Sequence, residues 1–220
     1  SDIKELKDSI TYDSIIIATK PNNYVEILED LKNHIAVNEE ILIISILAGI
    51  KIKKIQNIIG SVPIIRAMPN IAASVAEGMT ALTGNKKITN DKIDTANMIF
   101  QSIGNKIWLE DEGQMDSFTA ISGSGPAYFF YFTECLHKIA IDEGFSEDVA
   151  KQISEQIMIG SGKLIKDSNI DVVQLRENVT SPNGTTEAAL KVLCDDDGLL
   201  SKLREAIEKA KKRSIEIANN

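Results

Sequence analysis

Two polar loops in the second half of the chain contain residue types that bind small anions. Residues 122–127 read SGSGPA and residues 181–186 read SPNGTT, and a stretch with helical spacing follows each loop. The first backbone N–H groups of a helix have no acceptor within the helix, so either loop could offer donors to a carboxylate or a phosphate. Neither pattern is specific by itself, because Ser, Thr, Gly and Pro are common where ordinary helices begin.

Three further segments follow apolar runs in the first half of the chain. They are ATKP at 18–21, LAG at 47–49 and RAMPN at 66–70. Ligands of open parallel sheets bind at the carboxyl ends of the strands, so these segments are candidates for one binding edge. Each segment also has a plain structural interpretation. In ATKP the lysine could be a solvated residue that closes a strand, and LAG could be a simple strand-to-helix turn. In RAMPN the methionine could belong to the core and the asparagine to a turn.

Nucleophiles, general acids and metal ligands form no recognisable set. His34 and His137 have no partner motif, and Cys135 and Cys194 have neither metal-type spacing nor the number needed for a disulfide framework. The acidic run at 195–197 lacks the alternating ligand spacing of a calcium loop. We therefore expect no metal site, two buried free thiols and a reducing, cytoplasmic location.

In the first half of the chain, predicted strands alternate with predicted helices, and these elements must position the loops. Short β-branched runs alternate with stretches of helical spacing, which predicts a parallel sheet with right-handed crossovers. Strands are expected at 14–19, 41–46, 61–67, 79–82 and 106–109, and helices at 22–34, 51–59 and 90–103.

The second half is expected to contain helices only. Its run Tyr128–Phe132 is apolar nearly all round, as in a helix that is buried on every side. A domain of about a hundred residues cannot cover such a helix alone, so a partner subunit is expected. The predicted fold class is α/β plus all-α. A partial Rossmann-like parallel-sheet domain over 1–112 is followed by a helical dimerisation domain over 113–220.

Overall charge and hydropathy exclude two classes of partner. The formal net charge is −8 and the pI is near 4.9, which argues against nucleic acid, because phosphate binding needs clustered Lys and Arg. No apolar run reaches the length of about 20 residues that spans a membrane. A small-molecule partner remains compatible with this composition.

Taken together and in order, several segments resemble the pyrroline-5-carboxylate reductase family. The matching stretches are ATKP, SILAGI, IIRAMPN with AEGMTAL, TAISGSGPAY and VTSPNGTTEAAL. The resemblance implies an oxidoreductase of proline biosynthesis that reduces 1-pyrroline-5-carboxylate to L-proline with NADPH or NADH. It also implies an interlocked homodimer, which can assemble further into a ring of dimers.

The resemblance assigns site residues in both halves of the chain. The residues implied for cofactor binding are Ala18, Lys20, Pro21, Ala48, Gly49, Met68, Pro69 and Asn70. The residues implied for substrate binding are Ser181, Asn183, Gly184, Thr185 and Thr186. The Thr186 hydroxyl matches the catalytic group near the ring nitrogen of the substrate, and in the dimer this loop comes from the opposite subunit.

The sequence departs from the family pattern at two places. Asn183 stands where Gly is usual, although Asn tolerates positive φ better than most residues. The glycine-rich GxGxMG loop of the family is not found before Ser14, so the chain is expected to begin about fifty residues later than its relatives. On that expectation the chain alone would bind cofactor poorly and expose a sheet edge.

Two other functions remain open from the sequence. The first is a catalytically incompetent fragment that acts only as an oligomerising helical module. The second is a related reductase acting on another imine or on a β-hydroxy acid. The β-hydroxy acid enzymes use a catalytic lysine in their helical domain, and here Lys138 is the only lysine of the apolar helix and lies in no matching motif.

Overall fold

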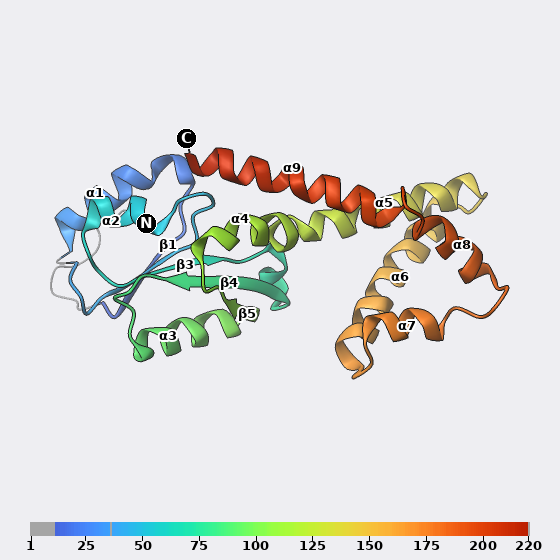
Figure 1. Cartoon of the computed structure of the whole chain (residues 1–220), viewed down its shortest axis with the longest axis horizontal. Helices are drawn as coiled ribbons and strands as arrows, with labels where there is room; N and C mark the ends of the chain where they lie inside the picture. Colours follow the sequence, from blue (N-terminus) through green and yellow to red (C-terminus); the bar gives the residue numbers. More distant parts are fainter. Residues whose placement is uncertain (1–11, 36, 220) are drawn as a thin grey trace. The chain divides into compact units, whose positions relative to one another are not determined.

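The computed structural model describes residues 12–35 and 37–219 (Figure 1). The chain forms two compact units. One unit holds the residues up to Ser124 together with Lys209–Asn220, and the other holds Gly125–Glu208. The first unit therefore extends beyond residue 112, where the sequence suggested a domain boundary, and it includes the end of the last helix.

A five-stranded sheet forms the centre of the first unit, in the order β1-β2-β3-β4-β5. Its strands are β1 (Ser14–Ile17), β2 (Leu42–Ser45), β3 (Ile64–Met68), β4 (Gly78–Gly84) and β5 (Gly104–Trp108). Neighbouring strands are parallel except β3 and β4. The sheet is thus mostly parallel, as expected, with one antiparallel pair that the pattern did not predict. Only a short link joins β3 to β4, whereas a parallel crossover needs a dozen or more residues.

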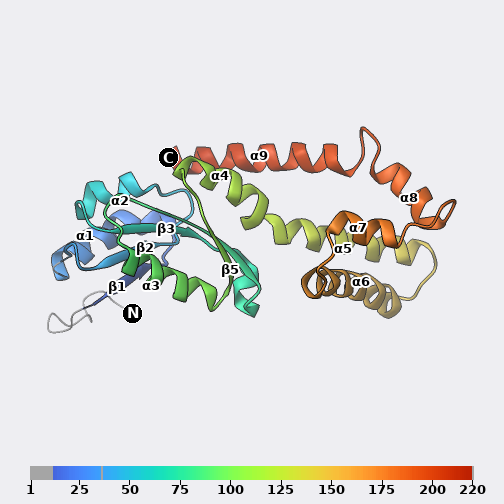
Figure 2. The same cartoon turned by 60° about the horizontal axis from the view of Figure 1, so that its bottom comes forward.

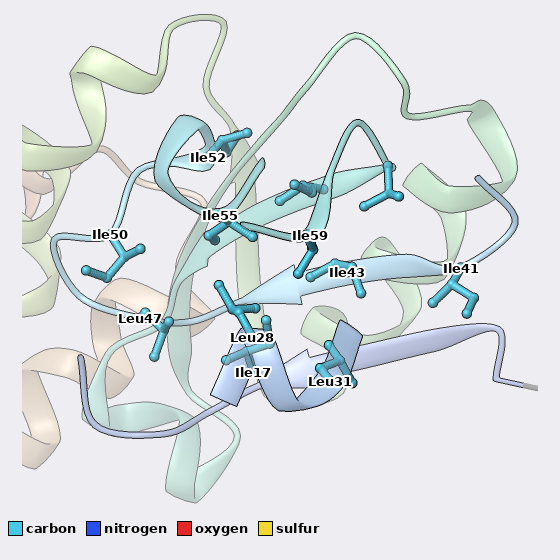
Figure 3. Close-up of a cluster of buried hydrophobic side chains, with 12 residues drawn as sticks. Ile17, Leu28, Leu31, Ile41, Ile43, Leu47, Ile50, Ile52, Ile55 and Ile59 are labelled. Atoms are coloured by element: carbon cyan, nitrogen blue, oxygen red, sulfur yellow. The ribbon is translucent and has the colours of Figure 1, made fainter. Parts of the chain in front are cut away.

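Helices cover both faces of the sheet, because its central strands are apolar on both sides. The helices of this unit are α1 (Tyr24–His34), α2 (Ile52–Ile59), α3 (Asn90–Gln101) and α4 (Met115–Phe118), with 3-10 turns at Pro21–Asn23, Ile71–Val75 and Glu112–Gln114. Figure 3 shows the core under α1 and α2, which includes Ile43 of β2 and Ile55 of α2. On the other face, the core contains Phe100 of α3 with Leu42 and Ile44 of β2. Neighbouring residues of β2 therefore enter different cores, which explains its continuous apolar run.

From Gly125 to Glu208, a range that the structure describes completely, the chain forms helices and connecting turns only. The helices are α5 (Gly125–Asp142), α6 (Glu147–Asp167), α7 (Val172–Asn178), α8 (Thr185–Leu193) and the first part of α9 (Leu199–Asn219). Helices α5 and α6 pack against each other (Figure 2). Three aromatic residues of α5, Phe129, Phe130 and Tyr131, are 61%, 67% and 64% exposed. Within the part of this unit that the structure describes, these aromatic side chains of the apolar helix are therefore left uncovered.

No helix among the described residues is long and apolar enough to cross a membrane.

Candidate active site

Three of the predicted binding segments meet at one edge of the sheet. Residues 18–21 follow β1, residues 47–49 follow β2, and residues 68–70 lie at the end of β3. These three strands are adjacent and parallel, so their carboxyl ends lie at the same edge. Open α/β sheets bind their ligands at this edge.

The binding edge presents small and apolar surface beside a positive charge. Ala18 and Lys20 are exposed, while Ala48 and Met68 are partly exposed. Lys20 immediately precedes the 3-10 turn Pro21–Asn23. A flat ring could lie against the small residues while the Lys20 ammonium pairs with an anionic group.

Gly49 is required by packing inside the protein. Its φ is +76°, and a Cβ at this position would lie 2.9 Å from Cγ2 of Ile217 in α9. Ala218 is buried beside it, and Ser214, one turn earlier, donates to Oδ1 of buried Asp116 at 2.7 Å. The end of α9 therefore packs behind the loop that follows β2, a contact that no local sequence pattern indicated.

The Asn70 side chain bonds to two other segments of the first unit. Its Nδ2 donates to the backbone oxygen of Ser122 at 3.1 Å, and its Oδ1 accepts from the backbone N–H of Met79 at 3.3 Å. Met68 packs nearby, with its Cε 3.4 Å from the position of a Cβ at Gly123. The sequence suggested a pocket-lining segment here, but it did not indicate that the amide joins parts of the fold.

The stretch at residues 122–127 is not a free helix start. Thr119–Gly123 forms a π-helical turn that continues α4, and α5 begins at Gly125. The N–H of Ser124 donates to the carbonyl of Thr119 at 2.9 Å. The interpretation of this stretch as the start of a helix was wrong at its first residues, because helical structure begins before them and the N–H of Ser124 already has an acceptor.

A buried ion pair supports the same edge of the sheet. Nη1 of Arg66, in β3, lies 3.0 Å from Oε1 of Glu112, and Arg66 is 2% exposed. The same Glu112 oxygen accepts from the backbone N–H of Ile52, the first residue of α2, at 2.9 Å. Glu112 thus joins β3, α2 and the segment leading to α4. Sequence reasoning missed this pair, because the two charges are 46 residues apart.

A tight turn precedes α8 in the second unit. The N–H of Gly184 donates to the carbonyl of Ser181 at 3.0 Å, and Asn183 has a φ of +58°. A Cβ at Gly184 would collide with the Ser181 side chain. Helix α8 begins at Thr185, so the N–H groups of Thr185 and Thr186 belong to its first turn, where a helix offers no acceptor.

Glu187 holds this turn in place, and sequence reasoning missed it. Its Oε2 accepts from the backbone N–H of Asn183 at 2.7 Å. The Nζ of Lys191 lies 3.6 Å from its other oxygen. A signal was available, because a Glu three residues after the N-cap, here Gly184, is the capping-box position.

Other reactive side chains lie apart from these loops in the sequence. Lys138 donates to Glu134 at 2.6 Å, and this hydrogen bond raises the pKa of Lys138 above its ordinary value. Cys135 is partly buried and Cys194 is exposed, so the prediction of two buried thiols was wrong for Cys194.

Within the described part of the chain, no three His, Cys, Asp or Glu side chains could hold a metal ion.

Known proteins match this chain over nearly its whole length. A family model for pyrroline-5-carboxylate reductase dimerisation matches residues 112–217. The pyrroline-5-carboxylate reductase of Pseudomonas aeruginosa is 33% identical over 207 residues, which cover 94% of this chain and 75% of that protein. The corresponding protein of Synechocystis sp. is 37% identical over 203 residues, covering 92% and 74% of the two chains.

Solved structures show the same likeness. A pyrroline-5-carboxylate reductase from Coxiella burnetii matches with a TM-score of 0.88 and 36% identity, covering 94% of this chain and 76% of that one. The Plasmodium falciparum pyrroline carboxylate reductase, solved with NADP bound, matches with a TM-score of 0.81 and 32% identity, covering 94% and 77%.

Proposed function

The chain belongs to the pyrroline-5-carboxylate reductase family, and we propose that it reduces 1-pyrroline-5-carboxylate to L-proline with NADPH or NADH, a step of proline biosynthesis. The observation that carries this proposal is the extent of the match. Relatives of this name cover 92–94% of the chain at 33–37% identity, and the similarity includes both units.

The binding edge of the sheet is the proposed cofactor site. We assign to it Ala18, Lys20, Pro21, Ala48, Gly49, Met68, Pro69 and Asn70. Small residues beside one cation fit a flat, anionic dinucleotide, whose nicotinamide supplies the hydride when bound. Gly49 and Asn70 contribute through their backbones, because Ile217 occupies the space at Gly49 and the Asn70 amide is bonded to the protein.

The turn before α8 is the proposed substrate site. We assign to it Ser181, Asn183, Gly184, Thr185 and Thr186. The first-turn N–H groups and the positive end of the helix dipole suit the substrate carboxylate. The Thr186 hydroxyl would bond to the ring nitrogen and hold the proton there. Hydride addition to the imine carbon, with that proton on nitrogen, gives the amine of proline.

A homodimer is part of the proposal. The match to a dimerisation family model and the exposed aromatic residues of α5 support it. In such a dimer, the loop before α8 would come from the partner subunit. Further exposed apolar residues on α6 and α7, such as Ile159, Leu164 and Val172, leave surface for a ring of dimers. The free thiols fit a cytoplasmic location, and the net charge of −8 disfavours nucleic acid.

Thr186→Ala tests the reaction and the role of this hydroxyl. We expect kcat with pyrroline-5-carboxylate to fall about a hundredfold, because the variant cannot hold the proton at the ring nitrogen. Oxidation of NADPH and of NADH is followed by absorbance. Thr186→Ser keeps the hydroxyl and should retain most of the activity.

Thr95→Ala is the matched control for this experiment. Thr95 is partly exposed on α3, and its hydroxyl donates to the Asp91 carbonyl four residues earlier, at 2.9 Å. Wild-type turnover in Thr186→Ala would refute the assigned role. A folded wild-type protein that oxidises neither cofactor with this imine would contradict the proposed reaction.

A further inference from the structure

Asn70 uses both ends of its side-chain amide inside the protein. Nδ2 donates to the Ser122 carbonyl at 3.1 Å and lies 3.5 Å from the Ser122 hydroxyl, while Oδ1 accepts from the N–H of Met79 at 3.3 Å. These contacts join the end of β3, the start of β4 and the π turn. An ionised aspartate could accept from Met79 but could not donate to Ser122, and an alanine could do neither.

The π turn is held from both sides. On one side the Thr119 hydroxyl donates to the Met115 carbonyl of α4 at 2.8 Å. On the other side Met68 packs against Gly123, with its Cε 3.4 Å from the position of a Cβ there, and Asn70 bonds to Ser122. Such turns are rare and often occur at functional sites. The Met68–Asn70 segment and this turn are therefore joined by a hydrogen bond and by packing.

This turn is also where the chain passes from one unit to the other, between Ser124 and Gly125. The π turn and the proposed cofactor segments both belong to the first unit, whereas the proposed substrate loop would come from the partner subunit. Hydride transfer needs the reacting atoms about 3–3.5 Å apart, and a misplacement of about 1 Å can cost about a hundredfold in rate. A side chain that holds the Met68–Asn70 segment in place can therefore control turnover through the position of the hydride donor, without its amide touching the cofactor.

We propose that Asn70 is a positioning residue, which holds the Met68–Asn70 segment against the π turn at Ser122 and thereby fixes the place of the hydride donor in the proposed cofactor site. This inference rests on the proposed reductase function. Asn70→Ala should lower kcat about tenfold or more, with each KM changing about twofold or less. Asn70→Asp keeps the acceptor for Met79 but loses the donor to Ser122, and it should be similarly impaired.

Asn85→Ala separates positioning from a merely structural role. Asn85 also donates to a carbonyl, that of Val62 at 2.7 Å, and accepts from a backbone N–H, that of Ile64 at 3.3 Å. It does so at the opposite end of β3. Both alanine variants should lose thermal stability to a similar extent, but only Asn70→Ala should lose turnover. Ser122→Ala keeps the carbonyl acceptor, so its kcat should stay within about twofold of wild type.

Methyl NMR of Met68 gives a readout that does not depend on catalysis. The chain has 5 methionines, which makes assignment of this methyl signal practical. In Asn70→Ala and Asn70→Asp the Met68 signal should shift and broaden, because the segment is released from Gly123. In Asn85→Ala it should stay where it is in the wild type.

Three outcomes would overturn the inference. The first is a raised KM for the cofactor with unchanged kcat, which would show that Asn70 binds the cofactor directly. The second is an equal loss of turnover in Asn70→Ala and Asn85→Ala, and the third is an unmoved Met68 signal in Asn70→Ala. If the wild type does not reduce the imine, the proposed function fails, and the Met68 signal alone decides whether Asn70 holds the Met68–Asn70 segment against the π turn.

Discussion

At the scale of single residues, Glu187 stabilises the turn before α8, in which position 183 is an asparagine with positive φ. Asn183 has a φ of +58°, in the left-handed region that Asn tolerates better than other residues with a side chain. The Glu187 carboxylate accepts its N–H at 2.7 Å, and Lys191 lies beside that carboxylate. Glu187 therefore keeps the turn closed and leaves the N–H groups of Thr185 and Thr186 for another acceptor.

Glu187→Ala should raise the KM for the imine about fivefold, because loss of one hydrogen bond of about 1 kcal/mol loosens the turn. The KM for the cofactor should not change, since the cofactor site lies on other segments. Steady-state kinetics at saturating cofactor measure the effect. Glu187→Gln keeps an acceptor and should stay near wild type. Glu39→Ala, which removes an exposed carboxylate paired with Lys87, is the control, and an equal effect in that variant would contradict the prediction.

At the scale of elements, α9 contributes to both units. It begins at Leu199 in the second unit, and from Lys209 onward it belongs to the first. Its end is fixed by the buried hydrogen bond from Ser214 to Asp116 and by the packing of Ile217 against Gly49. The shape of the loop after β2 therefore depends on the last turns of the last helix.

Gly49→Ala should reduce the free energy of unfolding by about 2–3 kcal/mol. About 1–2 kcal/mol comes from a Cβ in the left-handed conformation, and the rest comes from its collision with Ile217. Urea unfolding measures the stability, and NADPH fluorescence titration should show weaker binding.

Gly60→Ala isolates the backbone part of this effect. Gly60 has a φ of +91°, and nothing lies within 4 Å of its Cβ position. It should therefore lose stability without losing cofactor affinity. Equal stability and equal cofactor binding in the two variants would show that the contact with α9 has no role.

At the scale of the whole molecule, the helical unit leaves a large apolar surface open. Phe129, Phe130 and Tyr131 lie next to one another in the sequence of α5, and all three are more than half exposed. Consecutive residues of a helix point in different directions, so α5 exposes aromatic side chains on more than one side, as expected of a helix that a partner covers. A second copy of the chain is the partner that the dimerisation family match supports.

Phe130→Asp should weaken the homodimer about thirtyfold or more, which corresponds to the roughly 2 kcal/mol of an interface hot spot. Sedimentation equilibrium measures the dissociation constant. Activity should fall with the dimer fraction, because each site would take its substrate loop from the partner. Met98→Asp, at a residue that is 71% exposed on α3, should leave the dimer intact. A Phe130→Asp protein that stays fully dimeric would count against α5 as the interface.

The sequence by itself determined the elements, the mostly parallel sheet followed by helices, and the family. These features depend on local information. A strand buried on both faces, such as β2, is recognised by a short continuous run of apolar residues, here Leu42, Ile43 and Ile44. Comparison with known proteins confirmed the family and the fold.

Only the tertiary structure decided which residues, far apart in the sequence, contact one another around the binding segments. Asn70 bonds to Ser122, Gly49 meets Ile217, and Arg66 pairs with Glu112. The reversal of β4 and the π turn before α5 were likewise absent from the local pattern. Hydrophobic periodicity reports which face of an element is buried, but not which partner lies against it. That partner is set by how the whole chain packs, so these contacts could not be predicted from residue spacing.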